Sequence, residues 1–210
     1  MGLIVKIDKK LNLVTNITRE DGSIVYLHVT PFPYEVVEEH CLLLGNLFTN
    51  FISQVGGLGA ARVAAMMLRK KLQREQELRD EANQQAQQAQ QAQQAQQAPT
   101  IVDEIQRLTS VVWNDGGTWK TTSFDAAMKQ GIISPDEYRE VEGEVVFFMV
   151  SSAIQKAHLI APTVGSVIGM FGGQLVSSSV TAFRDSLQTS NLPTDTQTQN
   201  AQPETSHIPS

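Results

Sequence analysis

Residues 11–29 read LNLVTNITREDGSIVYLHV, and this stretch carries the clearest β-structure signal in the sequence. Its first half alternates between apolar and polar side chains, and residues 23–29 are rich in β-branched and aromatic side chains. Asp21-Gly22 lies between the two halves and is the strongest short sequence signal for a β-hairpin. With residues 3–7 as a further candidate strand, we expect a small antiparallel hairpin or meander near the N-terminus.

Prolines at positions 31 and 33 end the predicted sheet, because proline cannot donate a ladder hydrogen bond. Residues 34–54 then follow the period of an α-helix. The helix carries an apolar stripe with spacings of four and three, formed by Val37, Cys41, Leu44, Phe48 and Phe51. A second stripe widens this face, so the helix is predicted to be buried on a wide arc or to contact a partner.

A second helix is predicted to begin near residues 58–62, after a glycine-rich break. The glycines superficially match a phosphate-binding loop, but they lie between two predicted helices, so we interpret them as a helix–helix hinge. Beyond Leu72 the helix becomes charged and includes i,i+4 pairs of opposite sign. A solvated helix is therefore expected to project toward residue 84.

Residues 84–98 contain five near-perfect copies of Gln-Gln-Ala. On a helix each repeat turns the alanine by about 60°, so no fixed apolar stripe forms. The tract is either a solvated helical extension or, as its composition favours, a disordered connector. It divides the chain into an N-terminal part, 1–83, and a C-terminal part of the same domain, 99–187, followed by a polar tail, 188–210, predicted to be disordered.

The C-terminal part is predicted to be mostly helical. Residues 101–108, extended by Val111 and Val112, form a short amphipathic helix, and residues 119–124 form an extended piece. Residues 125–130 form a helical turn ended by Gly131, and residues 134–137 are a capping box that starts a longer helix. That helix carries a second broad apolar face with Val141, Val145 and Phe148. The expected fold class is therefore α+β, mainly α.

The aromatic side chains around the Gly116-Gly117 turn are predicted to anchor this loop to the core. They are Trp113, Trp119 and Phe124. The alternative is that these aromatic side chains bind a ligand.

Composition and motifs point away from catalysis and from nucleic acid. The net charge is −6 and the pI is about 5.2, whereas nucleic-acid-binding domains usually carry a basic patch. His40 and the single cysteine, Cys41, are helix neighbours that point about 100° apart, so they cannot share a metal ion. We expect Cys41 to be a small core residue in a cytosolic protein. No catalytic, cofactor-binding or metal-ligating residue is nominated.

Residues 159–183 contain no charged side chain, and Gly165, Gly169 and Gly173 recur at four-residue spacing. This small-xxx-small pattern is typical of closely packed membrane helices. Several serine and threonine residues and Pro162 lower the hydrophobicity, however. A close-packed or partner-ordered helix and a loosely ordered segment are therefore both favoured over a membrane span.

Several stretches resemble tail assembly chaperones of long-tailed, lambda-like bacteriophages. The resemblance is carried by VKIDKKLNLV at residues 5–14, DGS at 21–23, YLHVTP at 26–31, ARVAAMM at 61–67, IQRLT at 105–109, FDAA at 124–127 and VVFF at 145–148. It covers most of residues 3–186. The Gln-Gln-Ala tract departs from the short connecting loop expected in that family.

The resemblance implies a non-enzymatic protein that coats the helical tape-measure protein, keeps it soluble and recruits tail-tube subunits. It implies a location in the host cytoplasm and absence from the mature virion. The tape-measure protein is the expected partner, with the tail-tube protein and a second copy of this chain as further candidates. The two apolar helix faces are candidate client-binding surfaces or simply core. Alternatives are a structural virion component and a membrane-active protein using residues 159–183.

Overall fold

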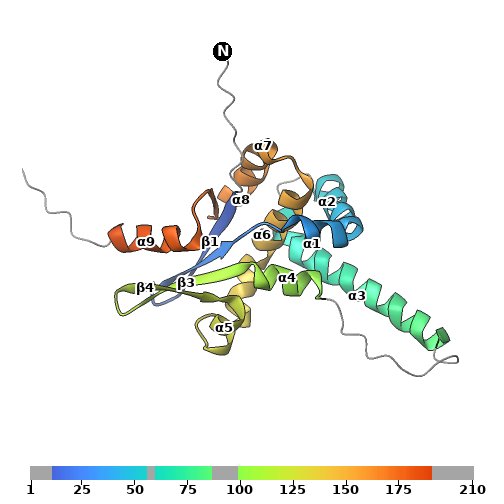
Figure 1. Ribbon diagram of the computed structural model, residues 1–210, viewed down its shortest axis with the longest axis horizontal. Helices are drawn as coiled ribbons and strands as arrows, with labels where there is room; N and C mark the ends of the chain where they lie inside the picture. The colour runs from blue at the N-terminus through green and yellow to red at the C-terminus, as the bar shows by residue number, and fades with distance from the viewer. Residues whose placement is uncertain (1–10, 56–59, 87–98, 191–210) are drawn as a thin grey trace, which may run out of the picture.

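The computed structural model describes residues 11–55, 60–86 and 99–190. It is an α+β structure in which a five-stranded antiparallel sheet carries helices on both faces (Figure 1). The mainly helical α+β class expected from the sequence is confirmed. The candidate strand at 3–7, the glycine hinge at 56–59, most of the repeat, 87–98, and the tail from 191 lie outside the described residues.

The predicted hairpin forms the centre of the sheet. Strand β1 (Asn12–Thr18) pairs with β2 (Ile24–Val29), with Ile17 opposite Val25. Gly22 closes the turn with a φ of 80°, a conformation that glycine adopts without a Cβ clash. The sheet extends well beyond the hairpin, in the order β4-β3-β2-β1-β5.

The other strands come from the C-terminal half of the chain, which the sequence analysis treated as mostly helical. They are β3 (Thr109–Asp115), β4 (Thr118–Ser123) and β5 (Gln174–Val176). Helix α4 (Ile101–Arg107) ends before Leu108, so the prediction that Val111 and Val112 extend it was wrong. Val111 pairs with Leu27 and Val112 with Tyr26, because β-branched residues fit beside the apolar residues of β2.

The predicted single helix over 34–54 is two helices, α1 (Tyr34–Glu39) and α2 (Cys41–Val55). His40 separates them, with φ −106° and ψ 17°. This break interrupts the helical phase, and the Cys41 side chain is exposed. The prediction that Cys41 is a core residue was therefore wrong.

Helix α6 (Pro135–Ile154) is the central helix of the larger core. It begins with the predicted capping box, in which Ser134 and Glu137 each bond the backbone N–H of the other. Helix α3 (Ala60–Ala86) crosses it closely through a small-residue face that includes Ala61 and Ala64. Helix α2 packs against both, and beyond the core α3 projects outward (Figure 1).

The two faces of the sheet are covered by different helices. Leu13, Ile17 and Leu27 belong to the larger core, which is built around α6. Val14 and Val112 belong to a smaller cluster closed by helix α9 (Val180–Ser190). Because successive strand residues point to opposite faces, the sheet is buried on both sides. Helix α9 includes residues 188–190, which had been assigned to the tail.

The aromatic residues beside the glycine turn pack against the protein itself. Phe124 is buried at the start of α5 (Phe124–Lys129), which is followed by Gly131 at φ 68°. Trp113 packs against the larger core, and Trp119 belongs to the smaller cluster. Their placement fits the anchoring role.

Residues 159–183 do not form one long helix. The segment contains parts of α7 (Ala157–Ile160), the π-helical turn η1 (Ala161–Gly165), α8 (Ser166–Gly169), β5 and the start of α9. Pro162 lies in the π-helical turn, and Gly172 takes a φ of 93° in the turn before β5. The segment is therefore ordered but is not a single helix, so both predictions for it were wrong.

Candidate functional surface

The seven residues nominated as client-binding or core faces all contribute to the larger core. Five are buried: Leu44, Phe51, Val141, Val145 and Phe148. The other two, Val37 and Phe48, are partly buried and pack against the same cluster. Phe51 of α2 and Phe147 of α6 also meet, with ring centroids 5.9 Å apart. These faces join α2 to α6 and are covered in this conformation.

A different set of apolar side chains is exposed among the described residues. The exposed large apolar side chains are Tyr34, Leu42, Ile52, Met66, Leu78, Ile154, Leu159, Met170 and Phe171. All except Leu78 lie on α1, α2, the early turns of α3, the end of α6, or the α7–α8 segment and the turn after it. We call these eight the helical-layer residues. Figure 1 shows α2, α7 and α8 at the end of the molecule opposite α5.

Helix α2 presents the most exposed of the helical-layer residues. Leu42 is 81% exposed, whereas its neighbours Leu43 and Leu44 are buried. Ile52 is exposed ten residues later on the same helix. Fully burying one such side chain stabilises a complex by roughly 1.5–3 kcal/mol. The outer side of α2 therefore carries apolar area that no described residue of the chain covers.

The α7–α8 segment presents a second group. Helical dihedral angles continue from Ile160 to Met170, and the π-helical turn lies at Pro162, whose nitrogen has no hydrogen to donate. Val164 and Ile168 are buried in the larger core, while Leu159 and Met170 face outward. The segment is thus amphipathic, with an exposed side that is partly apolar.

The helical-layer residues were not predicted, because helical periodicity selects the positions that share the core stripe. Leu42 and Ile52 lie off the stripe that contains Leu44 and Phe51. A large apolar side chain outside the main stripe was the sequence signal that could have indicated an exposed apolar position. On α7 and α8 no such signal existed, because the short elements of this region were not predicted.

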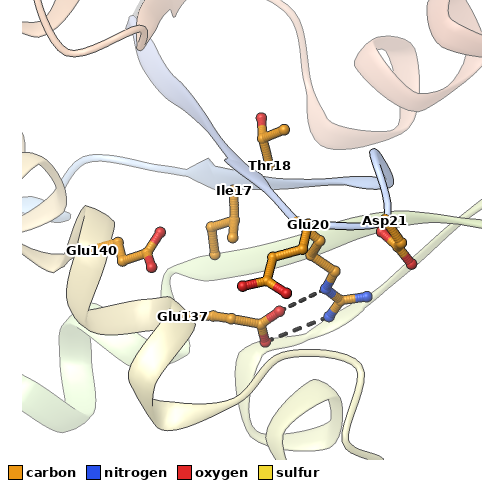
Figure 2. Close-up of a pocket in the computed structure, with 7 residues that line it drawn as sticks. Ile17, Thr18, Glu20, Asp21, Glu137 and Glu140 are labelled. Atoms are coloured by element: carbon orange, nitrogen blue, oxygen red, sulfur yellow. Dashed lines mark hydrogen bonds and ion pairs between the residues drawn. The ribbon is translucent and has the colours of Figure 1, made fainter.

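A polar depression lies at the C-terminal end of β1, beside the hairpin turn (Figure 2). Arg19 Nε lies 2.6 Å from Glu137 Oε1, and the same guanidinium donates to the carbonyl oxygen of Ile132. The hydrogen bond from Arg19 is the largest cause that lowers the pKa of Glu137. The Arg19–Glu137 ion pair thereby links the hairpin to the start of α6. Glu20, Asp21 and Glu140 also line the depression, which makes it acidic.

Glu144 is a buried carboxyl on α6 that faces the sheet. Its side chain accepts a hydrogen bond of 2.9 Å from Thr15 Oγ1 on β1. Burial raises the pKa of Glu144 to about 7, and the Thr15 hydrogen bond opposes the rise. The carboxyl therefore titrates near neutral pH inside the main core.

Comparison of the chain with protein-family models, with curated protein sequences and with solved structures gave no match. Within residues 11–55, 60–86 and 99–190 no three His, Cys, Asp or Glu side chains are grouped as metal ligands. No helix in these ranges is both long enough and apolar enough to cross a bilayer. The helical-layer residues are the candidate functional surface that the described part of the chain presents.

Proposed function

We propose that this protein is a non-enzymatic assembly chaperone that binds an apolar helical client through the helical-layer residues. The client is the tape-measure protein of a long-tailed bacteriophage, and the complex forms in the host cytoplasm. The chaperone then helps to recruit tail-tube subunits and is left out of the finished particle.

The observation that carries the proposal is the unequal distribution of exposed apolar side chains. They lie on α1–α3, on the end of α6, and on the α7–α8 segment and the turn after it, whereas no large apolar side chain is exposed on the described strands or on α4, α5 and α9. An amphipathic helix binds a complementary apolar surface through residues spaced three and four apart. Leu42, at 81% exposed, and Met170, at 67%, represent the α1–α3 group and the α7–α8 group and are the contacts chosen for testing.

The acidic charge is compatible with this role. The chain carries a net charge of −6, and the exposed acidic residues Glu35, Glu38 and Glu39 lie on α1 beside Tyr34. Acidic residues around an apolar surface favour soluble, reversible binding and repel nucleic acid. The sequence resemblance to tail assembly chaperones supports the identity of the client.

The proposal is tested by expressing the chain together with the long helical protein encoded immediately downstream. The wild-type chain is expected to keep this client soluble and to co-elute with it. A Leu42→Ser, Met170→Ser double variant should bind at least about tenfold more weakly, because losing about 1.4 kcal/mol of apolar contact is sufficient. Peptide mass spectrometry of purified particles should find no stoichiometric copy of the chain.

Leu78→Ser is the matched control. Leu78 is 59% exposed but lies on the projecting part of α3, outside the helical-layer residues. It should therefore keep full client binding. Failure of the wild-type chain to solubilise the client, or equal loss of binding in the control, would contradict the proposal. Stoichiometric peptides in particles would favour a structural virion component instead.

A further inference from the structure

The face of the sheet beneath α9 holds an aromatic pocket that one side chain fills. Phe183 of α9 packs edge-on to Tyr26, with ring centroids 5.4 Å apart, and lies 6.2 Å from the His28 ring. Tyr26 in turn lies 5.6 Å from Trp119 of β4. Val14 and Val112 form the buried floor. The rings and the floor of the pocket come from the strands, and the side chain that fills it comes from α9.

Helix α9 contacts the sheet through three apolar positions. Val180 and Leu187 are only partly buried, and Phe183 is the buried member. These positions follow the i, i+3, i+7 spacing of an amphipathic helix on a flat surface. At the far end, the Gln188 side-chain amide donates to the carbonyl oxygen of Trp119 at 3.1 Å. A helix of 11 residues has little stability of its own, so α9 depends on this docking.

A serine segment, residues 177–179, connects β5 to α9. The carbonyl oxygen of Ser178 accepts hydrogen bonds from Asn12 Nδ2 at 2.9 Å and from His28 Nε2 at 3.0 Å. Both donors belong to the sheet, so Ser178 is held by hydrogen bonds that are separate from the contacts of Phe183. The connection is therefore anchored at the edge of the pocket independently of the apolar side chains of α9.

Two buried polar atoms under α9 have no hydrogen-bond partner among the described residues. They are Trp119 Nε1 and Thr121 Oγ1, two residues apart on the same face of β4. Leaving a buried donor unpaired is costly, and native structures do so rarely. Helix α9 therefore covers this face with incomplete polar complementarity.

We propose that this face is a second binding site for an amphipathic helix, and that α9 is a detachable strap that occupies it until a partner helix displaces it. The partner helix presents a phenylalanine to the aromatic pocket, with apolar residues three positions before and four after it. It also presents an acceptor side chain, such as Asn, Gln, Asp or Glu, toward Trp119 Nε1. The site is separate from the helical-layer residues and does not depend on the tape-measure client.

The probe is a fluorescent synthetic peptide of residues 177–190, titrated into the full chain and followed by anisotropy. The wild-type chain should bind it weakly, because α9 is already docked. Phe183→Ser in the full chain should bind it at least about tenfold more tightly, because the pocket is vacated. The same peptide with Phe183→Ser should not bind either protein. Equal binding by the wild-type and Phe183→Ser chains would overturn the proposal.

Phe171→Ser is the matched control protein. It also loses a phenylalanine, but one that is exposed and outside the pocket, so peptide binding should equal that of the wild type. If the wild-type chain fails to solubilise the client while the peptide still binds Phe183→Ser, the proposed function is rejected and the strap is retained.

A second measurement uses only the wild-type chain, in case Phe183→Ser fails to fold. Hydrogen exchange of the α9 amides should proceed through local opening that is insensitive to low denaturant, whereas α6 amides should require global unfolding. If α9 and α6 amides share one denaturant dependence, α9 does not detach and the proposal is overturned.

Discussion

Glu144 makes the stability of the fold depend on pH at the level of one residue. Burial raises the pKa of its carboxyl from the ordinary 4.5 to about 7. Below pH 4.5 the Glu144 carboxyl is protonated in both the folded and the unfolded chain, so its contribution to the free energy of unfolding is at its maximum. As pH rises toward 7 the unfolded chain releases the proton while the folded chain retains it. Stability therefore falls over this interval, by at most about 3 kcal/mol.

Glu144→Gln should raise the free energy of unfolding at pH 8 by about 1–3 kcal/mol and change it little at pH 4.5. Glutamine keeps an acceptor for Thr15 but cannot ionise. Urea unfolding at the two pH values measures the effect. Glu140→Gln, an exposed position one turn earlier on α6, is the control and should show no such pH-dependent difference. A gain that is equal at both pH values would contradict the assignment.

His28 acts in the opposite direction. Burial lowers the pKa of this imidazole below 6.5, although the hydrogen bond to Ser178 opposes the change. The contribution of neutral His28 is complete above pH 6.5 and is lost as pH falls toward the lowered value. The sequence located His28 on a strand but could not predict its burial, because α9 covers it from more than 150 residues away in sequence.

At the scale of elements, the crossing of α3 and α6 depends on Gly143. A Cβ built at Gly143 would overlap the carbonyl oxygen of Ala61, so the two helices meet backbone to backbone. Ala61, Ala64 and Ala65 are small and buried on the facing side of α3. The close approach thus requires glycine on α6 and small side chains on α3.

Gly143→Ala should lower the free energy of unfolding by about 1–3 kcal/mol, because the added methyl forces the helices apart. Gly45→Ala on α2 is the matched control, since a Cβ there meets no atom within 4 Å. It should raise stability by about 0.5–1 kcal/mol through helix propensity. Chemical denaturation of the two variants checks both signs, and a stabilised Gly143→Ala would refute the close crossing.

Elements with strong local signals were predicted well. The hairpin turn at Asp21-Gly22 and the capping box of α6 appear where the sequence placed them. Val111 and Val112 were assigned to a helix because a short apolar run has no decisive period. Pairing with β2, more than 80 residues earlier in the chain, determined their strand conformation.

At the scale of the whole molecule, α3 extends beyond the core, and the chain packs against the core again at α4. Leu72 still packs against the core, and Ile101 of α4 is buried in it. Between them α3 continues to Ala86, about 21 Å beyond Leu72 at 1.5 Å per residue. The core therefore contains residues from both sides of the repeat.

Replacing residues 84–98 with about ten Gly/Ser residues should change the free energy of unfolding by less than about 1 kcal/mol and leave client binding intact. A linker of this length reaches about 33 Å when extended, and the closure entropy depends only weakly on length. Thermal unfolding and client co-elution measure the two effects. Loss of either would show that the tract contributes to the working structure.

Local features of this protein could be predicted from the sequence alone. Turn residues, capping residues and helical stripes act over a few positions, so they predict the hairpin, α3, α5 and α6 without knowledge of the fold. The sequence also determined the absence of a recognisable catalytic motif. Tertiary structure alone decided which apolar side chains are covered. It joined β2 to β3, exposed Leu42 and Cys41, and placed Phe183 between the aromatic rings, because burial depends on partners distant in the chain.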